Sequence, residues 1–269
     1  MSLFSMFSYH FMQRALLVGV LVSLCAALLG VSLVLKRYSM IGDGLSHVGF
    51  GALAVASAFH LAPLAVAVPV VVAAAVLLLR IRGSGRVKGD AAIAIISSSA
   101  LALGVIVVSV TSGMNTEVSS YLFGSILSLS RGDTILSVIL SLAVIGLFIL
   151  FYPRLFAVTF DETFARATGS RAELYNTLLA VLTAVTVVLG MRMMGALLIS
   201  SLIIFPAISA MRLCRSFRGV ILCAAGISVL CFLFGMTASY VFETPSGASI
   251  VAAELLALGF CSLAGGKRS

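Results

Sequence analysis

Charged side chains are scarce in this chain of 269 residues. Asp, Glu, Lys and Arg together make up only 10% of it, while 61% of the residues are hydrophobic. Soluble globular domains contain about 25% charged and roughly 45–50% apolar residues. This balance excludes a cytosolic globular enzyme, a disordered chain and a secreted disulfide-linked scaffold. The sequence therefore predicts an integral membrane protein with several spans.

Several motifs of enzyme chemistry are also missing. The chain has no G-x-x-x-x-G-K-[ST] phosphate loop, no H-E-x-x-H and no G-x-S-x-G, so we do not expect an enzyme, and any ATP hydrolysis would belong to another chain. The five cysteines lie in apolar stretches without C-x-x-C spacing, as buried small hydrophobes do. The 17 basic residues form no stripe interleaved with aromatics, so no nucleic-acid partner is expected.

Apolar stretches of about 20 residues, bounded by charge, Gly or Pro, predict an all-α polytopic transmembrane bundle in a single domain, 1–269. The nine predicted spans are 15–35, 38–61, 63–80, 91–112, 134–152, 174–192, 194–211, 219–241 and 247–264. As one helix, 174–211 would be about 57 Å long, so we expect it to fold back near 190–195. Eight spans are the alternative, if 38–61 and 63–80 connect differently or one of them is partly re-entrant.

The basic residues predict the orientation. Alternating the connections places all but three of the 17, Arg14, Arg131 and Arg192, on one side, which is cytoplasmic by the positive-inside rule. The N-terminus is then outside and the C-terminus inside, which requires an odd number of spans. The first span has its basic pair after the apolar run, so we expect it to be retained rather than cleaved. In the outer connection 113–133, an apolar stretch too short to span predicts a re-entrant or interfacial segment.

Asp43 and His47 are the first candidates for a functional site. They lie four positions apart in MIGDGLSHVGFG, so on a helix they share one face. If that helix begins at Tyr38, His47 is about 14 Å along it, near the middle of a roughly 30 Å core. A carboxylate and an imidazole are ligands for Zn(II) and for harder ions such as Mn(II). The structural alternative makes Asp43 the N-cap of a helix beginning at Gly44.

Two further residues are weaker candidates for the metal path. Glu254 lies in the last apolar stretch, about 12 Å beyond Ser246 on a helix, and we expect it to be paired within the bundle or protonated. His60, near the outer end of 38–61, is a candidate entry ligand. The alternative for His60 is a solvated histidine at the membrane interface.

The cytoplasmic segment 158–173 has the features of a short capped helix. Thr159 and Glu162 fit the S/T-x-x-E capping box, and Asp161 and Glu162 suit the positive end of the helix. Arg166 is nearer the other end, and Gly169 is a plausible stop. The two aromatics at helical spacing, Phe160 and Phe164, indicate a docking element for a partner. The alternative is a helix lying on the membrane surface.

Blocks spread over nearly the whole chain resemble the permease subunits of zinc/manganese/iron ABC importers. They are LVLKRYSMIGDGLSHVGFG (33–51), SSYLFGSILSLSRGD (119–133), TFDETFARATG (159–169), MMGALLISSLIIFPAISAMRL (193–213) and ETPSGASIV (243–251). The resemblance implies the type II importer permease fold and a bacterial plasma-membrane location. It also implies a homodimer or a heterodimer with a sister permease, cytoplasmic ABC ATPase subunits, and an extracytoplasmic metal-binding protein that delivers the ion.

The resemblance makes 159–169 the coupling helix that contacts the ATPase, and it places Asp43 and His47 on the polar pathway helix. Two positions depart from the family pattern. Relatives often carry Asp where this chain has Glu243, and their last span is usually apolar or amide-bearing near Glu254, so no role is transferred to that residue.

The leading hypothesis is a permease for a divalent transition metal, zinc first and then manganese or iron, with no cofactor of its own. One alternative is a proton-coupled secondary transporter that uses Asp43, His47 and Glu254 as a relay. Another is a non-transporting membrane scaffold whose segment 159–169 recruits a cytoplasmic protein.

Overall fold

The computed structural model describes residues 10–83, 89–111, 124, 130–196 and 198–265, and none of these forms a β-strand. The helices are α2 (His10–Leu35), α3 (Met40–Ala58), α4 (Pro63–Gly83), α5 (Gly89–Thr111), α7 (Arg131–Leu150), α8 (Tyr152–Phe160), α9 (Glu162–Ala167), α10 (Ala172–Met194), α11 (Ile199–Leu213), α12 (Phe217–Phe242) and α13 (Ser246–Gly265). This confirms the predicted all-α bundle.

Each of the nine predicted spans corresponds to a helix, and seven of these helices are long and apolar enough to cross a membrane. The two others are α3 and α11. Polar residues, Asp43 and His47 among them, lower the mean hydropathy of α3, and α11 has only 15 residues. Most of α3 is buried in the bundle, so it does not need the apolar surface that a lipid-facing helix needs.

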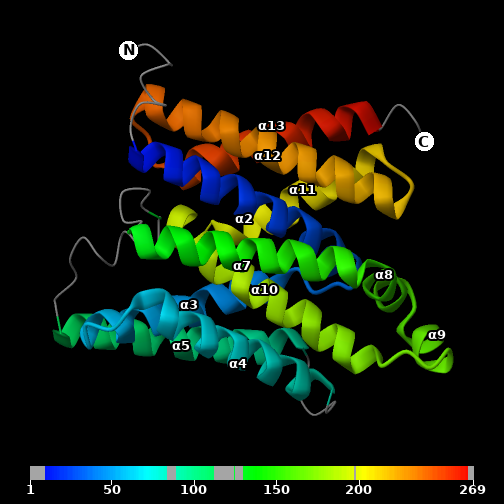
Figure 1. Ribbon diagram of the computed structural model, residues 1–269, viewed down its shortest axis with the longest axis horizontal. Helices are drawn as coiled ribbons and strands as arrows, with labels where there is room; N and C mark the ends of the chain where they lie inside the picture. The colour runs from blue at the N-terminus through cyan, green and yellow to red at the C-terminus, as the bar shows by residue number, and fades with distance from the viewer. Residues whose placement is uncertain (1–9, 84–88, 112–123, 125–129, 197, 266–269) are drawn as a thin grey trace.

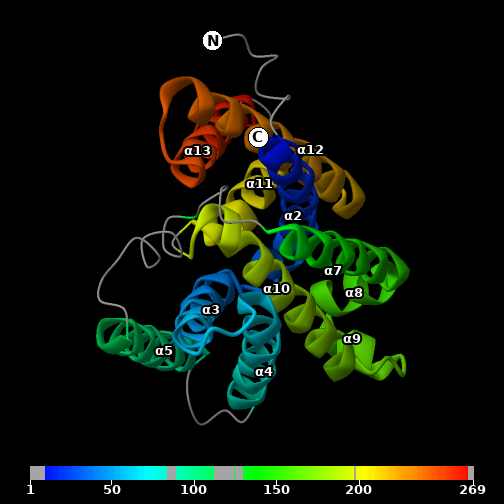
Figure 2. The same cartoon turned by 60° about the vertical axis from the view of Figure 1, so that its left-hand side comes forward.

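The helices form two groups on either side of a central pair. Figures 1 and 2 show α3, α4 and α5 on one side of α2 and α10, and α11, α12 and α13 on the other. The central helices α2 and α10 are the most enclosed. In the most apolar 18-residue stretch of each, 67% is buried, against 22–28% in the same stretch of α4, α5, α7 and α13. The short helices α8 and α9 lie together at one end of the bundle (Figure 1). This is the end that the charge bias predicts to be cytoplasmic.

Close backbone contact joins α3 to α5. A Cβ atom added at Gly51 would lie 2.7 Å from the backbone oxygen of Ala100, closer than real Cβ atoms come. Glycine therefore lets two helices approach more closely than a larger residue would allow. This contact fixes the position of α3, which carries Asp43 and His47.

The predicted fold-back in 174–211 is confirmed. Helix α10 ends at Met194, Gly195 has a φ of +89°, and α11 begins at Ile199. The prediction for 113–133 falls largely outside the described residues. In the part that is described, Ser130 accepts a hydrogen bond from the Asp133 backbone and caps α7, while the Asp133 carboxylate accepts from the Ser130 backbone.

Candidate functional site: a carboxylate–imidazole pair and a cytoplasmic docking segment

Asp43 and His47 lie on one face at the start of α3, as their spacing predicts. His47 Nε2 is 3.7 Å from Asp43 Oδ2, and Ser200 at the start of α11 donates a hydrogen bond to Asp43 Oδ1 at 3.4 Å. The His47 side chain is 16% exposed and that of Asp43 is 39% exposed. Helix α3 begins at Met40 with Ser39 in the N-cap position, so the alternative of Asp43 as an N-cap is wrong.

The start of α3 lies inside the bundle and not at its end. Cβ atoms added at Gly42 and at Gly30 would both contact Ile203, so the first turn of α3 is level with Gly30 of α2. Gly30 precedes Lys36 by six residues, which is about 9 Å along a helix. His47, four residues beyond Asp43, is then about 15 Å from that end of α2.

The pair faces a cavity of about 260 Å³ between α3 and α5. Besides Asp43 and His47, the cavity is lined by Met40, Asp90, Ile93, Ala94, Ser97, Ser98 and Leu101. Asp90, which lies in the first turn of α5, was not predicted from the sequence as a site residue. Its position next to a polar residue of α3 depends on the packing of two separate helices, for which one sequence carries no signal. The cavity therefore combines two carboxylates, one imidazole and two hydroxyls.

The two nitrogens of the imidazole have different surroundings, since Nε2 lies 3.7 Å from Asp43 Oδ2. His47 Nδ1 is buried and has no hydrogen-bond partner among the residues that the structure describes. Within the same described ranges, no group of three or more His, Cys, Asp or Glu side chains is placed to hold a metal ion. The described residues thus form no closed cage, and Asp43 and His47 remain two candidate ligands in an open site.

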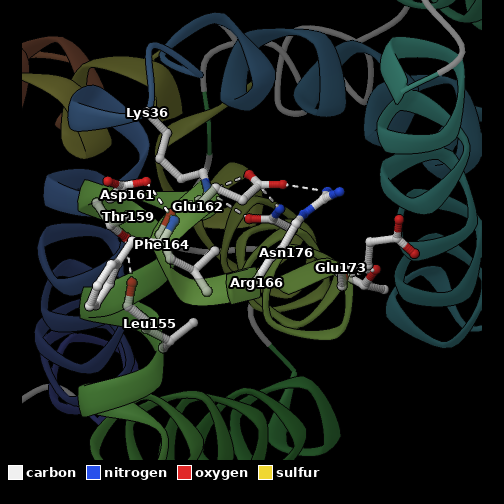
Figure 3. Close-up of polar contacts among 11 residues, drawn as sticks. Lys36, Leu155, Thr159, Asp161, Glu162, Phe164, Arg166, Glu173 and Asn176 are labelled. Atoms are coloured by element: carbon white, nitrogen blue, oxygen red, sulfur yellow. Dashed lines mark hydrogen bonds and ion pairs between the residues drawn. The ribbon is translucent and has the colours of Figure 1, made fainter. Parts of the chain in front are cut away.

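Segment 159–169, the predicted docking element, differs in detail from the prediction. It is divided between α8 and α9, and the chain turns between them at Asp161. Thr159 belongs to α8, where its hydroxyl donates to the Leu155 backbone oxygen at 2.6 Å, so the Thr159–Glu162 capping box is wrong (Figure 3). The cap of α9 is Asp161, whose Oδ1 accepts from the Phe164 backbone at 2.8 Å. The predicted stop is confirmed, because Gly169 follows α9 with a φ of +81°.

The aromatic side chains of this segment are both exposed. Phe160 is 59% exposed and its ring packs against those of Phe156 and Phe217, with centroids 4.8 and 5.5 Å away. Phe164 is 64% exposed, and it makes no ring contact within the described part of the chain. Arg166 donates to Glu162 Oε1 at 2.7 Å on the same short helix. The segment therefore presents apolar rings beside a charged pair.

Comparison with known proteins identifies the family. A sequence model of the ABC 3 transport family matches residues 8–264 of this chain. The chain belongs to the ABC 3 transport family.

Relatives of this family member carry names of metal transporters. It is 30% identical to the manganese transport system membrane protein MntC of Halalkalibacterium halodurans, over 94% of this chain and 87% of the relative. It is also 30% identical to the high-affinity zinc uptake system membrane protein ZnuB of Haemophilus influenzae, over 90% of this chain and 93% of the relative. This family member is a multi-pass bacterial membrane protein.

A solved structure shows the same fold. A chain in the structure of PsaBC from Streptococcus pneumoniae in complex with Fab superposes with a TM-score of 0.85. It is 30% identical and covers 94% of this chain and 91% of its own. The expected ABC permease fold is therefore confirmed.

The two weaker candidates lie away from the cavity. His60 is exposed, has a φ of +53° and follows the end of α3, so it is about 20 Å along the helix from His47. Glu254 is 1% exposed in α13, and neither of its carboxyl oxygens has a hydrogen-bond partner among the described residues. The structure thus brings together Asp43 and His47, and it leaves His60 and Glu254 apart from them.

Proposed function

We propose that this chain is the membrane permease of an ABC importer that moves a divalent transition metal ion into the cytoplasm. The observation that carries the proposal is the Asp43–His47 pair, which faces a cavity inside the bundle of an ABC 3 family member. Charged groups are costly inside a membrane protein, and those present there serve substrate pathways in many transporters.

The ligand chemistry suits transient binding. A carboxylate oxygen and a neutral imidazole nitrogen both coordinate Zn(II) and Mn(II). Two ligands hold an ion less tightly than a closed set of four, so the ion can leave toward the cytoplasm. Asp90, at the start of α5 in the same cavity, adds a second carboxylate on that way out.

Zinc and manganese are both supported as cargo, zinc first, with iron as a further candidate. The relatives named above include one manganese and one zinc system, and the Asp–His pair accepts either ion. A second permease, either another copy of this chain or a sister chain, would complete the central path. An extracytoplasmic metal-binding protein would deliver the ion.

Segment 159–169 is proposed as the contact with a cytoplasmic ABC ATPase. Its support is the exposed Phe164 ring, the exposed face of Phe160 and a helix held in a defined conformation by Asp161 and Gly169. A rigid helix with aromatic anchors is the kind of surface that fits a groove on a partner. Hydrolysis of ATP by that partner would drive the exchange between inward- and outward-open states.

Uptake of radioactive zinc and manganese into proteoliposomes that contain the permease and its ATPase tests the proposal. The D43A/H47A double variant is expected to lower uptake at least tenfold while it still captures the ATPase, because both proposed ligands are lost and 159–169 is unchanged. The matched control is H60A, which removes a histidine outside the cavity and should leave uptake within about twofold. Undiminished uptake of both ions by D43A/H47A would contradict the site, and uptake without ATP would contradict the ABC mechanism.

A further inference from the structure

Lys36 is a buried cation at the junction of three cytoplasmic elements. It directly follows α2, and its side chain is only 6% exposed. Its Nζ donates to the Val158 backbone oxygen of α8 at 2.9 Å and to Asn176 Oδ1 of α10 at 2.6 Å, and it lies 3.5 Å from Glu162 Oε2 of α9 (Figure 3). A single side chain thus joins the end of α2 to α8, α9 and α10.

The partners of Lys36 are also joined to one another. Asn176 donates from Nδ2 to Glu162 Oε2 at 3.0 Å, and Arg166 holds the other carboxylate oxygen. Burial would raise the pKa of Glu162, but the hydrogen bonds from Asn176 and Arg166 and the charges of Lys36 and Arg166 lower it below its ordinary value. Glu162 is therefore ionised at neutral pH. We name Lys36, Glu162, Arg166 and Asn176, with the Val158 carbonyl, the Lys36 junction.

The geometry of the junction favours concerted movement. The Lys ammonium has three donors, and three acceptors surround it here. A buried charge that loses its partners is strongly disfavoured, so a displacement of α9 must either move Lys36 with it or break the junction. Breaking the junction costs more free energy than moving Lys36 together with α9, because Glu162 would then also lose a charge partner.

The short turn that follows Lys36 connects α2 to α3, the helix that carries Asp43 and His47. Helix α2 is closed by hydrogen bonds from the Arg37 backbone to Val34 O at 3.0 Å and from the Tyr38 backbone to Leu33 O at 2.8 Å. Arg37 takes the left-handed conformation, with a φ of +58°, that this type of helix end requires. Helix α3 starts three residues later, and Asp43 follows in its first turn. The short, hydrogen-bonded turn 36–39, here called the α2–α3 corner, therefore connects Lys36 to the helix that faces the proposed ion path.

We infer that Lys36 is a positioning residue that transmits displacement of α9 through the α2–α3 corner to Asp43 and His47. The inference rests on the proposed function, in which α9 contacts an ATPase and α3 lines the ion path. Lys36 itself touches neither the ion nor the ATPase in this mechanism. It couples the two sites because both depend on the arrangement of one junction.

The test measures how many metal ions are moved for each ATP hydrolysed. The permease and its ATPase are reconstituted in proteoliposomes, with zinc and manganese supplied in turn. The K36M variant keeps the length and apolar stem of the side chain and removes the donors and the charge. We expect K36M to lower the ratio at least about fivefold, the lower end of typical coupling between sites, while ATPase capture stays within twofold.

Three further variants separate coupling from general stability. R37M removes the neighbouring exposed cation, whose side chain makes no hydrogen bond within the described ranges, and it should leave the ratio within about twofold. K36R keeps the positive charge and hydrogen-bond donors, and it should retain a higher ratio than K36M. Adding E162Q to K36M should lower the ratio no further than K36M does, because both changes break one junction.

The outcomes are decisive in both directions. A K36M ratio within twofold of wild type, or an equal fall in R37M, would overturn the inference. If K36M fails to assemble, K36R decides, since assembled K36R complexes with an unrestored ratio would also overturn it. Wild-type vesicles that move neither ion would refute the proposed function itself, whereas normal wild-type transport with an unaltered K36M refutes the role of Lys36 alone.

Discussion

Arg192 donates from Nη2 to Asp133 Oδ2 at 2.9 Å and thereby joins the end of α10 to the first turn of α7. The two side chains are 7% and 16% exposed, so the ion pair is largely removed from solvent. The pair lies at the opposite end of α10 from Asn176. The two ends of this central helix are thus held by different charged contacts.

Removing the Asp133 charge should destabilise the protein. D133N keeps a side-chain oxygen that can accept from the Ser130 backbone but removes the charge that pairs with Arg192. We expect a loss of about 3 kcal/mol in the free energy of unfolding, the lower end of the range for breaking a buried pair. Reversible unfolding in detergent measures it. The control S130A removes only the cap and should cost about 1 kcal/mol. Equal losses in the two variants would show that the ion pair adds nothing.

Glu162 should make the anchoring of α9 depend on pH. Its folded-state pKa is lowered from the ordinary value of 4.5, so this stabilisation is fully present above about pH 4.5 and is lost as the pH falls through the lower folded-state value. E162Q should mimic the acid state at neutral pH and increase trypsin cleavage after Arg166. The matched control is E173Q, which removes an exposed carboxylate nearby on α10. Cleavage that is equally slow in wild type, E162Q and E173Q would contradict the anchoring role.

The two exposed phenylalanines should differ in their effects. F164D places a charge where the ring has no aromatic neighbour within the described residues, so it should abolish ATPase capture and leave the melting temperature almost unchanged. F160D should impair capture and also lower the melting temperature, because it removes ring contacts with Phe156 and Phe217. Capture on an affinity resin and thermal unfolding in detergent measure the two effects. Full capture by F164D would argue against docking through this face.

Gly51 should be intolerant of even one methyl group. G51A would force α3 away from Ala100 of α5, and we expect a loss of about 1–3 kcal/mol in the free energy of unfolding, together with reduced uptake through the disturbed cavity. The control is G146A in α7, where an added Cβ meets nothing within 4 Å. That variant should gain up to about 1 kcal/mol from helix propensity. Equal stability of the two variants would refute the importance of the close contact.

Glu254 should tolerate a neutral amide. The residue is 1% exposed, its carboxyl oxygens have no hydrogen-bond partner among the described residues, and burying an unpaired charge is costly. We therefore expect E254Q to be at least as stable as wild type and to retain uptake within about twofold. Thermal unfolding and the uptake assay measure both. A large fall in uptake with unchanged stability would instead place Glu254 on the ion path.

The sequence predicted the features that depend on local pattern. Runs of apolar residues located the helices, and the length of 174–211 required the break now seen at Gly195. The spacing of Asp43 and His47 placed them on one face, because helical periodicity is a local property.

Features that depend on contacts between distant segments were not predicted. Asp90 reaches the cavity only because α5 packs on α3, and Lys36 meets Asn176 across 140 positions of sequence. The capping prediction at Thr159 was wrong for a different, local reason. The chain turns at Asp161, which leaves Thr159 near the end of α8. Thr159 and Asp161 are only two positions apart and both residue types can cap a helix, so the sequence alone did not distinguish them.

The charge of Lys36 serves first in membrane insertion and later, once it is buried, in a contact of the folded protein. Lys36 and Arg37 directly follow α2, and by the positive-inside rule a basic pair at this position biases how the nascent helix enters the bilayer. Once α9 and α10 have been synthesised and packed, Lys36 is enclosed while Arg37 remains exposed. The charge that helps to orient α2 thus becomes part of a structural contact that later parts of the chain complete.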